Sequence, residues 1–434
     1  MSPKAVVAAI GKDRKEWDES IDKELGSMKE KGAFEKINAR QLSNLKEKAW
    51  KKQQQVIILP SQVVFTLKDQ GKNMKTRLVA CGNFEGETPN QTKTNELDQT
   101  MFKTLVAWSA SRKGSTIGSV DITTAFLNAT LPPNRIVVLR APWALTQTGH
   151  LGREEFLLLK RAVYGLRDSP KLWGDYRNEA LSKVTLTIAG RPCRLEHSEY
   201  HHSLWVVLDA KATKETGTST EYGDWLDSEG NLMLVPSKFR SRDILGLVGI
   251  YVDDMVTGGP QNVIEDVHKA IQKVWKTSDS EILTPTHSLK FCGIDVKDTG
   301  TSIILYLTEY TQELVKRNKD LCKSKRSTTA EPETFSKKKQ PPRAPTPQEL
   351  AKFQRVLGEV LWISTKTRPD ISYAVSLAAS SATRDALETT QRLEWLVSYL
   401  ANRPDLGLEF HRSSRAEVDP NTSCVTVFSD SSFA

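Results

Sequence analysis

The chain contains the stretch ILGLVGIYVDDMVT at residues 244–257. A mostly apolar run reaches Val252, is interrupted by Asp253 and Asp254, and then resumes before Gly258-Gly259-Pro260 ends it. This pattern predicts a β-hairpin with carboxylates at its tip. Carboxylates beside apolar strands are costly unless a partner or a metal compensates their charge. Taken alone, however, an Asp-Asp pair in a turn is more often an ordinary hydrated turn than a site.

Asp121 is the expected companion of this hairpin. It follows Val120 as Asp253 follows Val252, and a strand-to-helix corner is expected there. Neighbouring strands in one sheet would bring Asp121 and Asp253 together. Successive residues of a strand face opposite ways, so Asp253 is favoured over Asp254 as the metal ligand. Two such carboxylates suit Mg²⁺, and two ions about 3.5–4 Å apart could activate a hydroxyl and stabilise a leaving pyrophosphate.

Length and composition are compatible with a multi-part enzyme that binds a polyanion. The 434 residues exceed one compact core and suggest two to four subdomains. Lysine and arginine number 61 against 53 acidic residues, a net charge of +8 that favours polyanionic partners without proving them. The five cysteines form no CxxC pair, which fits a reduced, intracellular chain. No apolar stretch approaches the roughly 18 residues of a membrane span.

Several other segments have a clear pattern. We expect a helix over Lys15 to Ile37 that is broken at Gly32, and a basic hairpin between Val56 and Gly82. A polar surface insertion is expected near residues 210–241, because it is rich in glycine, threonine and charge. The tryptophans Trp173, Trp275 and Trp362 have helical spacing and are expected in the core.

Three motifs resemble copia-type reverse transcriptases and occur in that family's order. Ser119-Val120-Asp121-Ile122-Thr123-Thr124-Ala125-Phe126-Leu127-Asn128 looks like the first palm motif. Leu159 to Trp173, which contains Tyr164-Gly165-Leu166-Arg167-Asp168, resembles the template-and-nucleotide segment. Tyr251-Val252-Asp253-Asp254 resembles the metal-binding hairpin. Three ordered matches make the hydrated-turn interpretation much weaker.

The resemblance extends over nearly the whole chain. Lys75 to Gly82 is similar to the fingers hairpin, and Leu289 to Val296 to the primer-grip region. Arg355 to Gly358 and Thr367 to Ile371 look like the connection that follows the thumb. Phe428 to Ser431 resembles the first strand of an RNase H domain. Asp430 would be the only acid for RNase H chemistry, so that activity is expected to be absent.

The resemblance implies an α+β, right-hand polymerase fold: fingers, a palm with an antiparallel sheet and a thumb, followed by a connection region and the first strand of a truncated RNase H domain. The expected division is a helical lead-in (1–55), fingers (56–118), palm with a fingers segment and the polar insertion (119–260), thumb (261–320), a basic, proline-containing linker (321–349), connection helices (350–415) and the truncated RNase H-like start (416–434).

Site residues follow from the same motifs. Asp121, Asp253 and Asp254 are the expected catalytic acids, with Asp121 and Asp253 as metal ligands for two Mg²⁺ ions, or Mn²⁺ as an alternative. The expected nucleotide-binding residues are Lys75, Arg77, Phe126, Gly165 and Arg167.

Each nucleotide-binding assignment competes with a structural explanation. Lys75 and Arg77 could contact a triphosphate, or lie on a solvated hairpin face. Phe126 could exclude a 2′-hydroxyl, or only pack in the palm core. Gly165 could allow close approach of a ligand, or only break a helix.

Three residues depart from the family pattern. Thr123 replaces a usual lysine, Asp168 a usual glutamine and Cys292 a usual leucine. Asp168 would repel a triphosphate unless a neighbour such as Arg167 or Lys171 compensates its charge.

The three ordered motifs make an RNA-directed DNA polymerase the expected function. The alternative is an inactive remnant that retains nucleic-acid binding, and a basic module unrelated to polymerases is disfavoured by the ordered motifs.

The expected partners are an RNA template, a DNA primer, dNTPs and other parts of a Pol polyprotein, with no membrane and no prediction of oligomeric state. The expected location is cytoplasmic, in a virus-like particle, with the nucleus as a second location.

Overall fold

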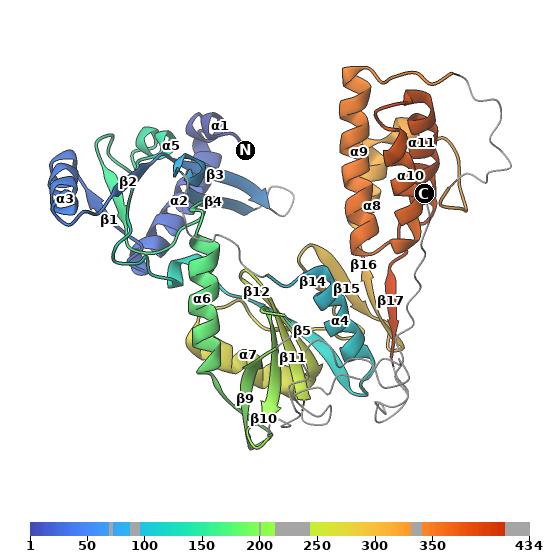
Figure 1. Ribbon diagram of the computed structural model, residues 1–434, viewed down its shortest axis with the longest axis horizontal. Helices are drawn as coiled ribbons and strands as arrows, with labels where there is room; N and C mark the ends of the chain where they lie inside the picture. The colour runs from blue at the N-terminus through green and yellow to red at the C-terminus, as the bar shows by residue number, and fades with distance from the viewer. Residues whose placement is uncertain (69–72, 87–95, 199–200, 213–243, 331–340, 413–434) are drawn as a thin grey trace, which may run out of the picture. The chain divides into compact units, whose positions relative to one another are not determined.

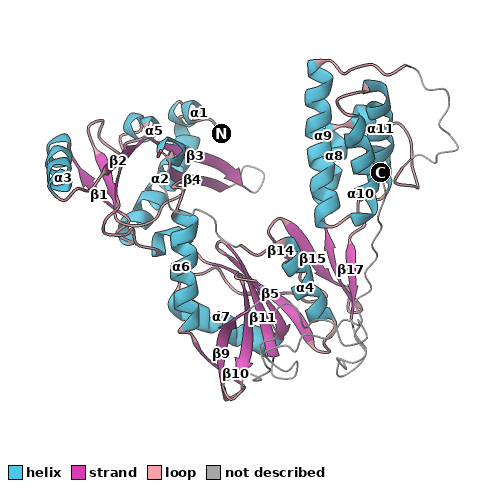
Figure 2. Cartoon of the chain, viewed as in Figure 1, coloured by secondary structure: helices cyan, strands magenta, loops and turns pink. Residues whose placement is uncertain are grey.

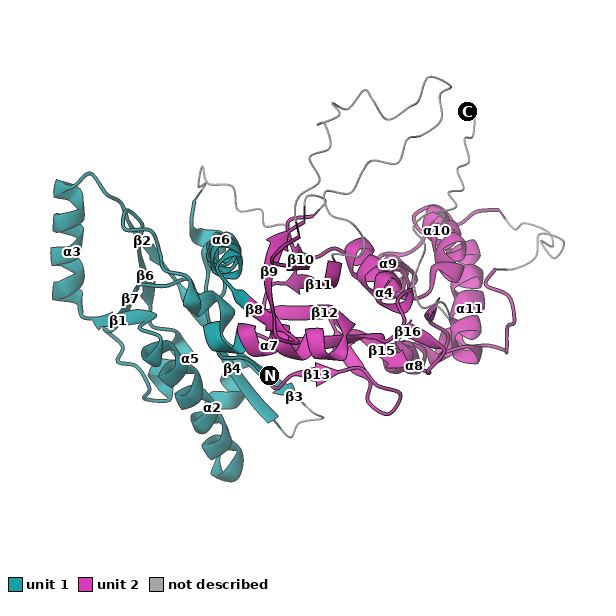
Figure 3. Cartoon of the chain, turned by 90° about the horizontal axis from the view of Figure 1, so that it is seen from below, with its two compact units in different colours: residues 1–96, 122–185, 271–278 teal, residues 97–121, 186–270, 279–434 magenta. Residues whose placement is uncertain are grey.

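The computed structural model describes residues 1–68, 73–86, 96–198, 201–212, 244–330 and 341–412 (Figure 1). Helices are interspersed with strands that pair mainly antiparallel, so the fold of this chain is α+β (Figure 2). Unit 1 comprises residues 1–96, 122–185 and 271–278, and unit 2 comprises the rest (Figure 3). The RNase H-like strand expected at 428–431 and most of the insertion expected at 210–241 lie outside the described residues.

Unit 1 combines helices with a small sheet and a separate hairpin. Its helices are α1 (Pro3–Val7), α2 (Gly11–Glu30), α3 (Ala39–Lys51), α5 (Trp143–Gln147) and α6 (Ser169–Ser182), with the 3₁₀ turns η2 (Gly82–Phe84) and η3 (Ala125–Asn128). Its sheet has the order β1-β7-β6-β2, from β1 (Phe34–Ile37), β7 (Phe156–Leu159), β6 (Ile136–Arg140) and β2 (Val56–Leu59). β2 and β6 are parallel, and the other two pairs are antiparallel.

The basic hairpin predicted between Val56 and Gly82 is present as β3 (Ser61–Lys68) and β4 (Asn73–Ala80). One face of the hairpin packs on α2, where Trp17 meets Phe65 edge-on with ring centroids 5.2 Å apart. Ser20 and Thr76 add a hydroxyl contact of 2.9 Å between the two elements. The alternate residues of β4 therefore point away from α2.

The predicted helix over Lys15 to Ile37 is wrong in its second half. α2 ends at Glu30, and Gly32 takes a left-handed φ of 61°. β1 then pairs antiparallel with β7. The breaker was expected at Gly32, but a strand of only four residues is too short to be recognised by its own pattern.

Unit 2 contains most of the seven-stranded sheet that carries the hairpin of residues 244–257. Its order is β13-β5-β12-β11-β10-β9-β8. The strands are β13 (Glu281–Ile282), β5 (Ser115–Asp121), β12 (Asp254–Pro260), β11 (Ile244–Tyr251), β10 (Leu204–Asp209), β9 (Arg191–His197) and β8 (Thr185–Ile188). The hairpin predicted around Asp253 is thus confirmed, and β5 lies directly beside it.

Two helices pack against this sheet so closely that they require glycine. A Cβ at Gly118 of β5 would lie 2.5 Å from Ile264 of α7 (Gln261–Val274). A Cβ at Gly258 of β12 would lie 2.3 Å from Ser109 Oγ of α4 (Gln99–Ala110). These contacts fix β5 and β12, the two strands that carry the acids, against rigid helices.

The rest of unit 2 is a second sheet and a helical bundle. The sheet has the order β14-β15-β16-β17, from β14 (Leu289–Phe291), β15 (Ile294–Asp298), β16 (Ser302–Tyr306) and β17 (Leu408–His411). The helices are α8 (Thr308–Arg317), α9 (Pro347–Lys366), α10 (Ser372–Ser381) and α11 (Ala386–Asn402), which share one core. β17 falls inside the segment that was predicted to be helical, and the division into thumb and connection stays a prediction.

The start of the predicted linker packs against the bundle. Trp395 of α11 donates its indole N–H to the Thr328 carbonyl at 2.9 Å, and the Arg326 guanidinium lies 3.8 Å from the ring centroid of Trp395. Asn402 donates to the Arg326 carbonyl at 3.1 Å. Residues 326–328 are therefore part of the folded bundle, whereas 331–340 lie outside the described residues.

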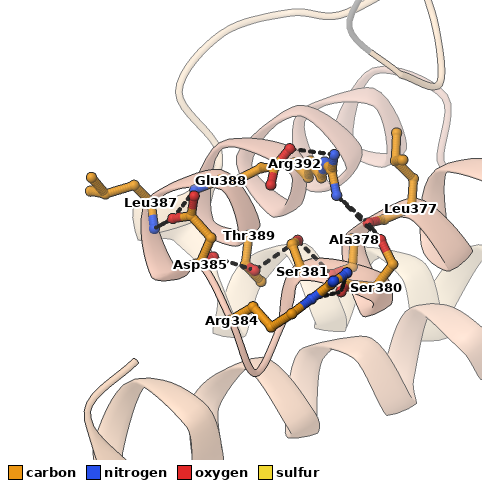
Figure 4. Close-up of polar contacts among 10 residues, drawn as sticks. All are labelled: Leu377, Ala378, Ser380, Ser381, Arg384, Asp385, Leu387, Glu388, Thr389 and Arg392. Carbon is orange, nitrogen blue, oxygen red and sulfur yellow. Dashed lines mark hydrogen bonds and ion pairs between the residues drawn. The ribbon is translucent and has the colours of Figure 1, made fainter. Parts of the chain in front are cut away.

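Side-chain hydrogen bonds close the turn between α10 and α11 (Figure 4). Asp385 caps α11 by accepting from the backbone N–H groups of Leu387 at 3.0 Å and Glu388 at 3.2 Å. Arg392 donates to the Leu377 carbonyl near the end of α10 and pairs with Glu388. Such caps satisfy backbone groups that a helix end leaves without partners.

Two of the three tryptophans predicted to be core are buried. Trp173 and Trp275 pack edge-on with centroids 5.6 Å apart, whereas Trp362 is 42% exposed and was predicted wrongly.

Among the described residues, no helix combines the length and apolar character that a membrane crossing requires.

Candidate active site

Three carboxylates gather at one end of the large sheet in unit 2. Asp121 is the last residue of β5, Asp253 lies in the turn, and Asp254 is the first residue of β12. One carboxylate oxygen from each residue lies within 4.8 Å of the other two. Asp121 is exposed, and Asp253 and Asp254 are half-buried. The predicted meeting of Asp121 and Asp253 therefore occurs.

The register adds a relationship that the sequence did not predict. Asp254, rather than Asp253, lies directly opposite Asp121 in the antiparallel pair of β12 and β5. Directly opposite residues project to the same face of a sheet. Asp253 joins them because it lies in the turn and is released from strand alternation. Strand alternation allows at most one of the two hairpin acids to share a face with Asp121 unless the turn rotates both, and here the turn brings both to Asp121.

A strained turn residue makes this arrangement possible. Tyr251 pairs with Asp254 across the hairpin, so Val252 and Asp253 form a two-residue turn. Val252 has a φ of 54°, a left-handed conformation that is costly for a β-branched side chain. Glycine is usual where such hairpins need a positive φ. Strain of this kind commonly occurs at functional sites, where the surrounding structure maintains it.

Three carboxylates at this spacing repel one another and form the all-oxygen donor set that hard divalent cations prefer. The donor set fits Mg²⁺ or Mn²⁺.

The nucleotide-binding residues predicted from the sequence lie in unit 1. Two of them, Arg77 and Phe126, contact the ring of Tyr164. The Arg77 guanidinium carbon lies 4.8 Å from the ring centroid of Tyr164. Phe126 meets the same ring edge-on, with centroids 5.0 Å apart. We call Arg77, Tyr164 and Phe126 the Tyr164 cluster. Lys75 lies two residues before Arg77 on the same face of β4 and is exposed.

Tyr164 was not predicted as a site residue. It lies inside the motif around Gly165, and an aromatic residue immediately before that glycine was the available signal. Phe126 is 9% exposed, so packing and a role beside a sugar are compatible with its position.

Gly165 is explained by a contact between two backbone segments. It has a φ of 89°, and a Cβ there would lie 2.0 Å from the Ala80 carbonyl oxygen. The Ala80 N–H donates to the Tyr164 carbonyl at 2.8 Å, and the Gly82 N–H donates to the Gly165 carbonyl at 3.2 Å. The glycine therefore joins the loop to the end of β4, which is neither of the two explanations expected from the sequence.

Arg167 and Asp168 make separate contacts. Arg167 donates to the Gly86 carbonyl at 3.0 Å. Asp168 is 6% exposed and lies 3.0 Å from the guanidinium of Arg135, which also pairs with Glu85. Burial raises the pKa of the Asp168 carboxyl, and Arg135 acts in the opposite direction. The neighbour that compensates Asp168 is thus Arg135, and not Arg167 or Lys171 as expected.

No family model matches the chain. A putative transposon Ty5-1 protein of Saccharomyces cerevisiae is 22% identical over 317 residues, which are 72% of this chain and 83% of that protein. The retrovirus-related Pol polyprotein from transposon RE1 of Arabidopsis thaliana is 24% identical over 374 residues, which are 83% of this chain. The alignment covers only 20% of that polyprotein, so the chain spans about a fifth of it. An uncharacterized mitochondrial protein of the same plant is 26% identical over 169 residues, 39% of this chain and 67% of that protein.

Among solved structures, a foamy viral protease-reverse transcriptase in complex with double-stranded DNA has a TM-score of 0.41 and 14% identity. The match covers 95% of this chain and 72% of that chain. A similarity at this level supports no conclusion about this chain.

Proposed function

We propose that the chain, which is similar to retrovirus-related Pol polyproteins of transposons, is the RNA-directed DNA polymerase part of a copia-type retrotransposon polyprotein. It would transfer deoxynucleotides to the 3′-hydroxyl of a DNA primer on an RNA or DNA template. The observation that carries this proposal is the meeting of three carboxylates within 4.8 Å: Asp121 and Asp254 on two adjacent strands, and Asp253 in the hairpin turn.

The three aspartates would hold two divalent cations, Mg²⁺ or Mn²⁺. When bound, such ions lower the pKa of an attacking hydroxyl and stabilise the charge on a leaving pyrophosphate. The contribution of the chain is to fix the oxygens. Asp121 and Asp254 are fixed by strand pairing and by helices packed against glycine, and Asp253 by the strained turn at Val252.

The basic residues of β4 would bind the triphosphate. Lys75 and Arg77 project from the face of β4 opposite α2, and the ring of Tyr164 supports the Arg77 guanidinium. A supported guanidinium loses less freedom when it meets a phosphate, and its planar fork matches two phosphate oxygens. Phe126, held by Tyr164, would exclude a 2′-hydroxyl by its bulk.

In the same proposal, residues 56–118 are the fingers, 119–260 the palm and 261–320 the thumb. The connection would begin at residue 350. RNA template, DNA primer and deoxynucleotides would be the partners, which agrees with the net charge of +8.

Primer extension on an RNA template with Mg²⁺ tests the proposal. Wild type, Asp253→Asn and Asp266→Asn are compared. Asp266 is a matched control because it lies in unit 2 on α7, pairs with Lys269 at 3.6 Å and is not part of the cluster of three carboxylates. We expect extension by wild type and Asp266→Asn, and none by Asp253→Asn. Equal extension by all three proteins, or none by any, contradicts the proposal.

A further inference from the structure

Three charged side chains from distant parts of unit 1 meet in its interior. Glu85 is 3% exposed and Asp168 is 6% exposed, and 10% of the Arg135 side chain is exposed. One terminal nitrogen of Arg135 lies 3.0 Å from Asp168 Oδ2, and the other pairs with Glu85. A single guanidinium thus bridges two buried carboxylates. We call these three residues the Arg135 bridge.

Each member of the bridge marks the end of a different segment. Glu85 follows η2, which continues from β4 and therefore from Arg77. Asp168 ends the loop that carries Tyr164 and Gly165. Arg135 immediately precedes β6.

Further hydrogen bonds join the segment that contains Glu85 to the loop that ends at Asp168. The N–H groups of Ala80 and Gly82 donate to the carbonyls of Tyr164 and Gly165, and Arg167 donates to the Gly86 carbonyl. The bridge closes one end of this row of contacts, and the Tyr164 cluster lies at the other.

Arginine is suited to this place and lysine is not. A guanidinium presents donors in a fixed plane and can serve two carboxylates at once, whereas an ammonium acts as one compact charge. A buried carboxylate that loses its cation is strongly unfavourable. If the loop moved away from β4, Arg135 would separate from at least one of its two carboxylates, which is unfavourable in free energy. The bridge therefore resists such movement.

We infer that Arg135 is a positioning residue: through Asp168 and Glu85 it holds the loop of residues 164–168 against the end of β4 and so sets the place of Arg77 and Tyr164. Asp168 stands where the family that the chain resembles usually has glutamine. In this inference it is the partner of Arg135, and it does not indicate an inactive remnant. The kinetic consequence rests on the proposed function, and the structural consequence does not.

Amide hydrogen exchange on the full chain tests the structural consequence. Arg135→Lys is compared with Arg140→Lys, an exposed arginine at the other end of β6. We expect the amides of Ala80 and Gly82 to exchange at least about tenfold faster in Arg135→Lys, with α2 unchanged. Wild-type exchange at Ala80 and Gly82, or equally faster exchange throughout unit 1, overturns the inference.

Asp168→Asn keeps the shape of the side chain and removes one charge, so it serves as the second variant if Arg135→Lys does not fold. It weakens one arm of the bridge, and a smaller local increase in exchange at the same two amides is expected. No local increase in Asp168→Asn would overturn the inference.

Steady-state kinetics test the consequence for the proposed reaction. In Arg135→Lys we expect KM for the deoxynucleotide to rise at least about fivefold, with kcat nearly unchanged, because the acids are untouched. If wild type extends no primer, the proposed function fails while the exchange result still decides the bridge. If wild type extends a primer and Arg135→Lys leaves KM unchanged, the positioning role is overturned.

Discussion

Asp254 lies directly opposite Asp121 across the antiparallel pair of β12 and β5. The two residues belong to separate sequence motifs, yet strand register makes them nearest cross-strand neighbours. Asp253 reaches the same place from the turn. Asp254 therefore has as direct a geometric relationship with Asp121 as Asp253 does, and we expect it to matter as much for catalysis.

Val252→Gly should cost little stability. Its left-handed φ of 54° disfavours a β-branched residue by about 1–2 kcal/mol, and glycine removes that strain while adding about 1 kcal/mol of unfolded-state entropy. We expect the free energy of unfolding to stay within about 1 kcal/mol of wild type. Val248→Gly, at a fully buried position of β11, is the control and should lose at least about 2 kcal/mol. Equal losses in urea unfolding would contradict the strain.

Phe126→Ala should weaken discrimination against ribonucleotides. Removing the ring opens the space that the 2′-hydroxyl would occupy, so the ratio of kcat/KM for deoxynucleotide over ribonucleotide should fall at least about tenfold. Phe34→Ala removes a half-buried ring of β1 and serves as the control. An unchanged ratio in Phe126→Ala, or the same fall in both variants, would leave Phe126 a packing residue only.

His268 should make unit 2 less stable in mild acid. Its ring is 1% exposed and lies 2.6 Å from Ser280 Oγ and 3.1 Å from Thr257 Oγ1. Burial lowers the pKa of His268 from 6.5 to about 4. The unfolded chain therefore takes up the proton first, and stability falls as pH drops from 6.5 toward 4, by up to about 3 kcal/mol.

His268→Gln checks this titration, because glutamine keeps hydrogen-bonding groups and carries no charge. The difference in unfolding free energy between wild type and His268→Gln should shrink as pH falls from 7 to 5. Parallel pH profiles for the two proteins would exclude the titration of His268.

Arg135→Met and Asp168→Asn should have very different effects on stability. Arg135→Met leaves two buried carboxylates without their cation and should cost about 3–5 kcal/mol. Asp168→Asn leaves Arg135 paired one-to-one with Glu85 and should change stability by less than about 1 kcal/mol. If thermal or urea unfolding shows similar losses of unfolding free energy in the two variants, the pairing of these charges does not determine the stability of the Arg135 bridge.

The pH dependence of Asp168→Asn has a definite sign. Burial raises the folded pKa of Asp168 above its unfolded value of 3.8, so the folded state holds its proton more tightly. Stability from this group therefore falls as pH rises through that window. The free energy of unfolding of Asp168→Asn, relative to that of wild type, should therefore be lowest at a pH below 3.8 and should rise as pH increases through the folded pKa of Asp168.

The acids were predictable from the sequence only in combination: Asp121 and the Asp253-Asp254 pair each follow an apolar run, and three motifs that resemble one family occur in its order. Their register was not, since pairing depends on where two distant strands align and on the conformation of one turn residue, Val252. Arg135 carried no signal, because its importance arises only when residues 85, 135 and 168 meet. β1 and β17 were missed for a related reason: each has four residues and is stabilised by a partner far away in the chain.

Single-turnover incorporation of one deoxynucleotide by Asp254→Asn, compared with Asp121→Asn, tests the three-carboxylate centre most directly. We expect both variants to be slower than Asp266→Asn by more than about 100-fold, beyond the range typical of residues that only support metal ligands. Incorporation by Asp254→Asn at the rate of Asp266→Asn, with Asp121→Asn inactive, would contradict the shared centre.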